Sequence, residues 1–271
     1  MTHEQAERTL IDAGAARDDA FPLMDAALAC AIHDQPGRGL EIAQASIDRA
    51  AARLEQRLTR AAPRAALAET MAGDLGFSGD TATYDDLDNA DIISVFARRR
   101  GLPVALGIIY IAVARRCGLT ARGLDFPGHF LLRLETPDGP MAIDPFNGGT
   151  PVEPAELTRR ARFAGLSPGE AGRHDRLMAP ATDRTVVTRL QNNILARAQQ
   201  SGDHGRAEGA ALRCALLNPA DPRFWLHVAG AREARGELAS ALQALGRAKT
   251  LDPGTARVAE AARERLRSKL N

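Results

Sequence analysis

The chain has 271 residues and a mass of 28.9 kDa, and its 35 basic and 34 acidic side chains leave a formal charge of +1. This length accommodates one or two domains with a full hydrophobic core. The near-neutral charge excludes binding to nucleic acid or to an anionic membrane that is driven by the net charge of the whole chain. At 45% hydrophobic and 25% charged residues, the chain is expected to be globular.

Alanine dominates the composition with 52 residues, whereas only two of the basic residues are lysines. Alanine loses no side-chain entropy when it enters a helix. The excess therefore predicts a mostly helical chain packed through small residues, although a GC-rich genome would give the same enrichment.

Residues 1–10 are charged and lack the apolar segment of a secretory signal peptide. The longest apolar run, 102–113, is too short to span a membrane. The three cysteines, Cys30, Cys117 and Cys214, fit neither a disulfide framework nor a zinc motif. We therefore expect a cytoplasmic protein without a cofactor, a bound metal or membrane association.

The first part of the chain, to about residue 75, has apolar residues at helical spacing, with breaks near Pro22, Pro36 and Pro63. An acidic, turn-rich segment follows at 73–91 and is expected to form an ordered loop. The N-terminal region is thus predicted to be helical.

A second helix-forming stretch begins at Pro103, because a proline at the first helical position loses no hydrogen bond. From Val104 to Cys117 the helix is apolar almost all round, and Gly118 ends it. We expect it at the centre of a core. Three short strands are then predicted at 121–126, 129–135 and 141–144, the last two joined across a turn at 136–140.

The C-terminal part repeats itself every 34 residues, which is the period of tetratricopeptide (TPR) repeats. The second copy, 222–255, carries Trp225 near its start, and the first copy, 188–221, lacks that aromatic residue. Residues 256–270 are expected to cap the array. Two repeats rarely stand alone, so we expect them to pack on the preceding domain; a plain helical bundle with coincidental spacing is the alternative. Residues at the 34-residue spacing are Gly202 and Gly236, Ala207 and Ala241, Cys214 and Ala248, Leu217 and Leu251, and Pro219 and Pro253.

His129 and Asp144 fall on neighbouring strands of the predicted hairpin. If the hairpin loop has an even number of residues, both side chains lie on one face, directly opposite or one diagonal step of about 7–8 Å apart. A carboxylate placed there fixes the tautomer of an imidazole and stabilises its charged form. The alternative is a structural histidine that is satisfied by the carboxylate.

The order of these motifs resembles the bacterial SirB-type proteins, from about Phe77 to the end. The resemblance is carried by Pro127-Gly128-His129-Phe130-Leu131-Leu132-Arg133 and by Ile143-Asp144-Pro145-Phe146-Asn147-Gly148-Gly149. It implies a papain/transglutaminase-like core with a small antiparallel sheet, followed by TPR-like helical repeats. Transglutaminase-like enzymes use a Cys-His-Asp triad, and His129 and Asp144 match its histidine and aspartate.

The cysteine of that triad has no counterpart. The enzymes carry Gly-x-Cys at the start of the core helix, and here Gly101-Leu102-Pro103 replaces it. Proline has no nucleophilic atom. SirB-type sequences share this departure from the enzymes. A non-catalytic protein is therefore favoured over an enzyme.

No other residue is an evident substitute for the missing cysteine. Cys117 lies at the far end of the same helix, about 21 Å from Pro103, where the helix dipole disfavours a thiolate. We expect it, like Cys30 and Cys214, to be a small buried side chain. Ser94 is nearer in sequence, but nothing marks it as activated.

Other candidate sites are weaker. The run 98–100 is a candidate anion contact, although a solvated face balanced by the acidic residues upstream is the simpler interpretation. A metal held by His129, Asp144 and His174 would have no diagnostic ligand spacing. The candidate binding residues are Trp225, Arg100 and Asn147.

These features predict an α+β, mostly helical fold. Residues 1–150 would hold the helical region and the transglutaminase-like core, which covers about 77–150. Residues 151–185 would connect this part to the repeats at 186–271.

The favoured function is non-catalytic: a transglutaminase-like/TPR protein that acts in protein–protein interaction or regulation. Helical repeats expose a concave surface suited to a protein or peptide partner, and the resemblance to SirB-type proteins implies a regulatory association. The alternative is a hydrolase or acyl-transfer-type enzyme in which His129 and Asp144 activate water or substrate without a cysteine. A third, intermediate hypothesis is that the chain binds a ligand in the cleft that remains from an ancestral active site.

Overall fold

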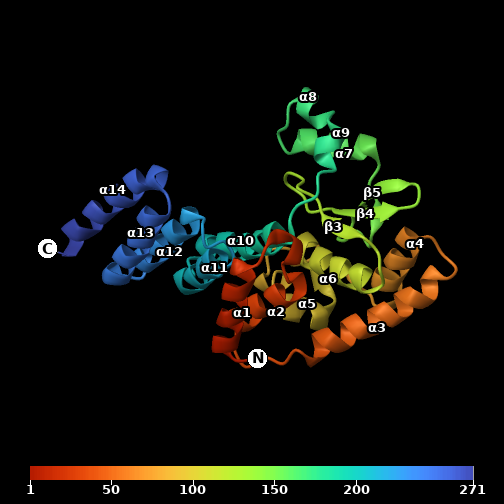
Figure 1. Ribbon diagram of the computed structural model, residues 1–271, viewed down its shortest axis with the longest axis horizontal. Coiled ribbons are helices and arrows are strands. Elements are labelled where there is room, and N and C mark those ends of the chain that lie inside the picture. Colours follow the sequence, from red (N-terminus) through yellow and green to blue (C-terminus); the bar gives the residue numbers. More distant parts are fainter. Residues whose placement is uncertain (271) are drawn as a thin grey trace. The chain divides into compact units, whose positions relative to one another are not determined.

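The computed structural model describes residues 1–270, which form two compact units (Figure 1). Unit 1 contains residues 1–21, 29–38 and the chain from 188 onward. Unit 2 contains residues 22–28 and 39–187. Each unit is therefore assembled from segments that are distant in sequence.

Unit 2 is built around helix α6 (Pro103–Arg116), which packs against α3 and α5. Its residues 103–111 are all buried, as the apolar sequence predicts. Pro103 occupies its first turn, and Gly118 follows its end with a φ of 76°, a left-handed conformation suited to glycine. Both predicted ends of this helix are confirmed. The other helices of this part are α3 (Glu41–Leu58), α4 (Pro63–Ala68), a π-helical turn (Glu69–Asp74), a 3-10 turn (Leu87–Asn89) and α5 (Ile92–Arg98).

A four-stranded antiparallel sheet contacts α6 through strand β3. Its order is β3-β4-β5-β6, and a separate parallel pair joins β1 to β2. In the hairpin, Thr136 pairs with Gly139, which leaves Pro137 and Asp138 as a two-residue loop. The even loop length meets the condition for placing His129 and Asp144 on one face. The strands are β1 (Ser78–Gly79), β2 (Arg100–Gly101), β3 (Ala121–Gly123), β4 (Leu132–Thr136), β5 (Gly139–Asp144) and β6 (Thr150–Pro151).

The segment 151–185 is more ordered than a plain connection. It contains α7 (Pro154–Phe163), α8 (Pro168–Ala171) and α9 (His174–Leu177). Two prolines that suggested a loop begin helices α7 and α8 instead. The three helices share a buried apolar cluster with residues of the sheet and of the β3–β4 connection, so they are part of the unit that holds the site.

Unit 1 is a series of helices in which α11, α12, α13 and α14 pack in succession, and α1 packs on α11. Gly202 and Gly236, which lie 34 residues apart, occupy equivalent helix–helix turns with φ values of 75° and 77°. Ala207, Ala241 and Ala248 are at most 1% exposed, as expected for close helix contacts. The 34-residue period thus corresponds to a repeated pair of helices. The helices that lie wholly or partly in this unit are α1 (His3–Ala15), a 3-10 turn (Asp18–Ala20), α2 (Leu23–Asp34), α10 (Asp183–Ser201), α11 (His204–Leu217), α12 (Pro222–Ala234), α13 (Leu238–Leu251) and α14 (Pro253–Leu270).

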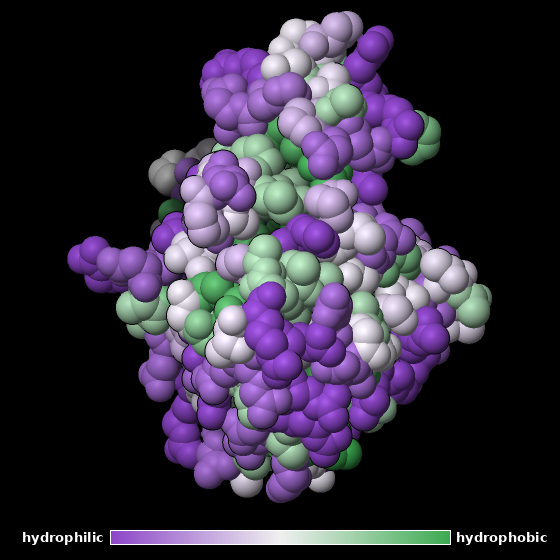
Figure 2. Space-filling model, turned by 90° about the vertical axis from the view of Figure 1, so that its right-hand side faces the viewer, coloured by the Kyte–Doolittle hydropathy of each residue, from purple (hydrophilic) through white to green (hydrophobic). Residues whose placement is uncertain are grey.

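The surface drawn in Figure 2 is predominantly hydrophilic, with hydrophobic side chains in small groups. The most exposed large apolar side chain among the described residues is Phe163, at the end of α7, which is 96% exposed. Within residues 1–270, none of the helices combines the length and the apolar character needed to cross a bilayer.

Candidate functional site

Asp144, the last residue of β5, is fully buried and forms the centre of the candidate site. Its Oδ2 lies 3.2 Å from His129 Nε2 and accepts hydrogen bonds from Arg160 Nη1 at 2.9 Å and from Asn147 Nδ2 at 2.8 Å. Its Oδ1 accepts the backbone N–H groups of Phe146 at 3.0 Å and of Asn147 at 3.4 Å. Both carboxylate oxygens are therefore satisfied without solvent.

These contacts keep Asp144 ionised. Burial by itself raises the pKa of Asp144, but hydrogen bonds from His129, Arg160 and Asn147 outweigh it and hold this pKa well below its usual range. Asp144 is therefore an anion at neutral pH, and it can orient His129 but has no proton to give.

His129 lies in the connection between β3 and β4, before the strand begins. The prediction of a strand over 129–135 was wrong at its first residues, because the chain bends at 127–129 and Gly128 has a φ of 71°. The pairing of Leu132 with Ile143, extended backwards, still places His129 one diagonal step from Asp144. The predicted His–Asp contact is therefore present.

The imidazole of His129 is accessible. Its side chain is 31% exposed, and its Nε2 faces Asp144. Because Nε2 is engaged by Asp144, Nδ1 is the ring nitrogen left for another partner.

Arg160 reaches the site from α7 and was not anticipated by the sequence analysis. Its Nε donates to Glu156 Oε1 at 2.7 Å, one helical turn earlier, and its Nη1 donates to Asp144. The same helix lies against the loop of His129, since a Cβ added to Gly128 would lie 3.2 Å from that of Ala164. A signal was present in the sequence, because Glu156 and Arg160 have the spacing of a helical ion pair behind Pro154.

Proline occupies the position expected for the nucleophile. Pro103 stands in the first turn of α6 and is buried. One turn further, Gly107 accommodates the ring of Phe130, the residue after His129, and a Cβ at Gly107 would overlap that ring. The start of the core helix therefore lies next to the histidine loop, as the resemblance implies, but Leu102 and Pro103 place no thiol or hydroxyl there.

Tyr110, further along α6, is fully buried, and its hydroxyl has no hydrogen-bond partner among the described residues. Burial raises the pKa of this phenol, and the charge of Asp144 raises it further. Tyr110 is therefore a neutral phenol and not an activated nucleophile.

The cysteines are poor substitutes for a nucleophile. Cys30 and Cys214 are at most 1% exposed, and burial raises the pKa of Cys30 to about 12 and also raises that of Cys214. Cys117 is partly buried, its Sγ donates to Ala51 O at 3.4 Å, and burial raises its pKa as well. A raised pKa disfavours the reactive thiolate.

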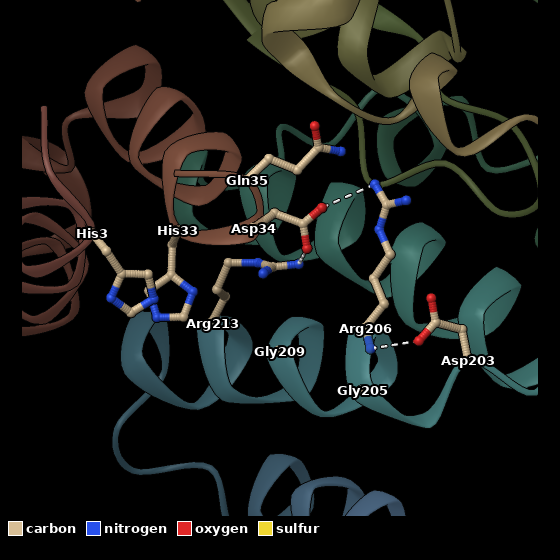
Figure 3. Close-up of a pocket in the computed structure, with 9 residues that line it drawn as sticks. All are labelled: His3, His33, Asp34, Gln35, Asp203, Gly205, Arg206, Gly209 and Arg213. Atoms are coloured by element: carbon tan, nitrogen blue, oxygen red, sulfur yellow. Dashed lines mark hydrogen bonds and ion pairs between the residues drawn. The ribbon is translucent and has the colours of Figure 1, made fainter. Parts of the chain in front are cut away.

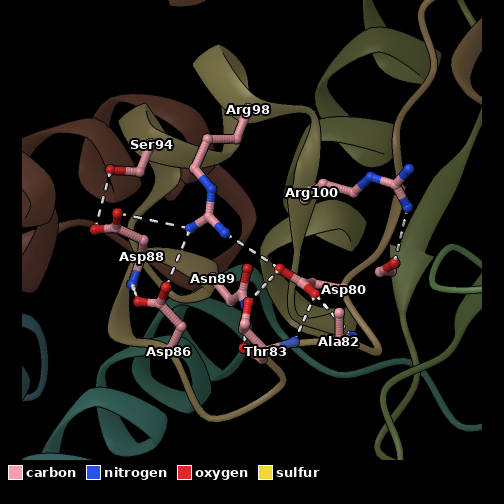
Figure 4. Close-up of polar contacts among 10 residues, drawn as sticks. Asp80, Ala82, Thr83, Asp86, Asp88, Asn89, Ser94, Arg98 and Arg100 are labelled. Atoms are coloured by element: carbon pink, nitrogen blue, oxygen red, sulfur yellow. Dashed lines mark hydrogen bonds and ion pairs between the residues drawn. The ribbon is translucent and has the colours of Figure 1, made fainter.

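The basic run 98–100 is largely engaged in local contacts (Figure 4). Arg98 Nη2 lies 3.1 Å from Asp80 Oδ2, and its Nη1 faces Asp86 and Asp88 at 3.7 and 3.6 Å. Arg100 Nη1 donates to the carbonyl of Gly79 at 3.5 Å. Upstream acidic residues thus balance Arg98, as the simpler interpretation of this run expected.

The other predicted binding residues fall in different places. Asn147 is exposed, and its side-chain Nδ2 donates a hydrogen bond to Asp144. Trp225, in α12, is 8% exposed, and the guanidinium of Arg247 lies 4.6 Å from its ring centroid in a cation–π contact. His174 lies 2.9 Å from Thr158 Oγ1 and does not join the site. Over residues 1–270, no group of three His, Cys, Asp or Glu side chains is arranged to hold a metal.

Comparison with known proteins shows which family model and which relatives the sequence matches. A family model described as the transglutaminase-like superfamily matches residues 41–192. A UPF0162 protein of Xylella fastidiosa strain Temecula1 is 34% identical over 211 residues, which cover 76% of this chain and 75% of that protein. No solved structure matches the chain significantly.

Shorter matches agree with this assignment. A UPF0162 protein of Vibrio cholerae is 34% identical over 135 residues, covering 48% of this chain and 50% of the relative. The UPF0162 protein YchA of Escherichia coli K12 is 38% identical over 77 residues, covering 28% of this chain and 29% of the relative.

Proposed function

The chain belongs to the transglutaminase-like superfamily and to the UPF0162 proteins, and we propose that it acts without catalysis, in protein–protein interaction or regulation. The observation that carries the proposal is Pro103 at the start of α6. A cysteine at this point would lie at the positive end of the helix dipole, which stabilises a thiolate. Proline offers no atom for covalent chemistry.

The surroundings of Asp144 support the same proposal. In a catalytic His–carboxylate pair, the unbalanced negative charge of the carboxylate stabilises the imidazolium that forms during reaction. Here the guanidinium of Arg160 donates to the same oxygen, Oδ2, that faces His129. Because Arg160 offsets the charge of Asp144, the carboxylate stabilises an imidazolium at His129 less than an unpaired one would.

The helical repeats supply a surface for a partner, which we infer to be a protein or peptide. The first helix of each pair presents exposed residues at i, i+4 and i+7 spacing, so each has one continuous exposed stripe. These stripes are Asn192, Ala196 and Gln199 on α10, and Arg223, His227 and Gly230 on α12. An extended segment laid across successive first helices would contact both stripes.

Affinity capture with matched variants tests the proposal. His227→Glu adds an acid to the exposed stripe of α12, and Gln243→Glu adds one to an exposed position of α13 in the same repeat. We expect partners bound by the wild type and by Gln243→Glu to be lost from His227→Glu. Equal capture by all three proteins would count against a partner surface on the first helices. Trp225→Ala is a less direct probe, because removal of this buried ring leaves a cavity that destabilises the repeat.

A second candidate function is favoured by the accessibility of His129. With Nε2 held by Asp144 and Nδ1 open, His129 has the arrangement of a general base acting on water. Hydrolysis of an acyl or amide probe in ¹⁸O-water tests this alternative, since water would be the nucleophile. Product carrying ¹⁸O that forms with the wild type and not with His129→Ala would favour the enzyme.

We further infer that the chain is related to the SirB-type proteins, that its helical repeats are of the TPR type, and that it has a regulatory role in the cytoplasm.

A further inference from the structure

A second polar cluster lies within unit 1, in a pocket of about 410 Å³ lined by residues at the end of α2 and along α11 (Figure 3). Asp34, the last residue of α2, faces Arg206 and Arg213, which lie two turns apart on α11. The Nη2 atom of each arginine lies 2.9 Å from a different oxygen of Asp34. One carboxylate therefore serves two guanidinium groups.

Buried polar atoms of the pocket lack hydrogen-bond partners among the described residues, and they include Nε and Nη2 of Arg206 and Oδ2 of Asp34. Each guanidinium carries several N–H donors and no acceptor. Arg213, whose side chain is 1% exposed, uses Nε on Gln191 and Nη2 on Asp34. The Nε of Arg206 is buried and has no hydrogen-bond partner among the described residues. Asp203, at the rim, is exposed and accepts the backbone N–H of Arg206 at 2.9 Å, so its carboxylate does not reach the inner donors.

His33 adds a buried polar group to the same pocket. The residue is 9% exposed, and its Nδ1 lacks a hydrogen-bond partner among the described residues. Its ring lies 4.3 Å from that of His3, centroid to centroid. Burial and the neighbouring charge of Arg213 lower the pKa of His33 to about 4, so the neutral ring can donate through one nitrogen. A buried polar atom without a partner is costly. In the tautomer that carries its proton on Nδ1, His33 can donate this hydrogen to an acceptor bound in the pocket.

Two glycines leave space in the pocket for an acceptor. Gly205 and Gly209 line the pocket one turn apart on α11. A Cβ at Gly209 would lie 3.3 Å from Nη1 of Arg213, so any larger side chain there would fill the pocket beside the guanidinium.

We propose that this pocket binds a small oxyanion, a phosphate or carboxylate group, held by Arg206, Arg213 and His33. The planar guanidinium groups match the geometry of such an anion, and the charge-assisted hydrogen bonds are strong in a partly desolvated site. The ligand would join α2 to α11 in unit 1. This inference concerns a site separate from His129 and does not depend on the proposed function.

Titration of the full chain with sodium phosphate, and in a second arm with sodium acetate, tests the proposal, with ionic strength held constant by chloride. The readouts are the ring signals of His33 by NMR and the thermal unfolding of unit 1, followed by the fluorescence of Trp225, the single tryptophan. We expect a saturable shift of the His33 signals and a higher unfolding temperature with at least one of the two anions. Saturation by phosphate or by acetate identifies the group that is bound.

Three variants sharpen the titration. Gly209→Leu should abolish the saturable response while the far-UV circular dichroism stays that of the wild type, and Arg206→Gln should weaken binding about tenfold or more. Arg223→Gln, which removes an exposed charge from α12, should bind as the wild type does. The proposal is overturned if neither anion gives a saturable response beyond that of chloride, or if both Arg206→Gln and Gly209→Leu bind as tightly as the wild type.

Discussion

Two buried aspartates, Asp144 in unit 2 and Asp34 in unit 1, each lie beside a histidine and pair with arginine, but their surroundings differ. Asp144 is fully buried, and donors from side chains and backbone satisfy both of its oxygens. Asp34 is shared between two guanidinium groups that have donors to spare. The neighbouring histidines are opposite in character, since His129 is open to solvent and His33 is buried.

The contrast separates two properties: resemblance to an enzyme site, and the presence of buried polar groups that have no partner among the described residues. The cluster at Asp144 has the outline of a catalytic pair, yet its charge is balanced by Arg160, and Pro103 in the first turn of α6 has no nucleophilic atom. The cluster at Asp34 resembles no catalytic motif, yet it has the unmatched donors that a ligand would satisfy. Unpaired groups, more than familiar motifs, point to a binding site.

The largest effect is expected from Asp144→Asn. Asp144→Asn removes the negative charge that pairs with Arg160 and turns an amide NH2 donor toward other donors. The free energy of unfolding of unit 2 should therefore fall by about 3–5 kcal/mol. Hydrogen exchange at the amides of α6 and β5 measures this loss. Asp175→Asn, at an exposed carboxylate of α9, is the matched control and should change stability by less than about 0.5 kcal/mol. Equal effects of the two substitutions would contradict the central position of Asp144.

A somewhat smaller loss is expected from Asp34→Asn, because the pocket admits solvent to the arginines that lose their partner. We expect unit 1 to lose about 3 kcal/mol, measured by denaturant unfolding with Trp225 fluorescence. If Asp34→Asn proved more damaging than Asp144→Asn, the distinction between an open and a closed cluster would fail.

Unit 1 and unit 2 should lose stability over different ranges of pH as the solution is acidified. The pKa of His33 is about 4 in the folded chain and about 6.5 in the unfolded chain. Between these values the unfolded state binds more protons, so unit 1 should lose about 2–3 kcal/mol as the pH falls from about 6.5 to about 4. The depressed pKa of Asp144 stabilises unit 2 above about pH 3.9, and this contribution is lost only as the pH falls below that value.

Unfolding at stepped pH values, monitored for each unit, checks this order. His33→Gln should flatten the dependence of unit 1 between pH 4 and 6.5 without changing that of unit 2. An unchanged slope in His33→Gln would mean that another group titrates.

The smallest effect is expected from Glu156→Gln, which removes the solvent-side partner of Arg160. Because Glu156 is partly exposed, the substitution should destabilise unit 2 by no more than about 1 kcal/mol. Amide exchange in β5 measures the change. A loss as large as that of Asp144→Asn would show that Glu156, and not Asp144, positions the guanidinium.

The sequence predicted features that depend on local pattern. Pro103 and Gly118 marked the ends of the core helix, and the 34-residue period marked the paired helices. The strand pattern predicted that His129 and Asp144 share one face if the hairpin loop has an even number of residues, and the two-residue loop of the structure meets that condition.

The features that were missed depend on partners brought together by the tertiary fold. Arg160 lay in a segment interpreted as a connection, because Pro154 and Pro168 suggested loops, although prolines also begin helices. Asp34 and Arg213 are far apart in the sequence, and helical periodicity predicts which face of a helix is buried but not which residues that face contacts. Polar networks of this kind follow from packing, which a single sequence does not disclose.

The most direct test of the central claim is a single-turnover assay of the full chain with acyl-ester and glutaminyl-peptide probes, read by mass spectrometry for both product and protein adduct. A non-catalytic protein with Pro103 at the nucleophile position should give no adduct, and its product formation should equal that of His129→Ala. An adduct, or product that forms with the wild type and disappears in His129→Ala, would contradict the account.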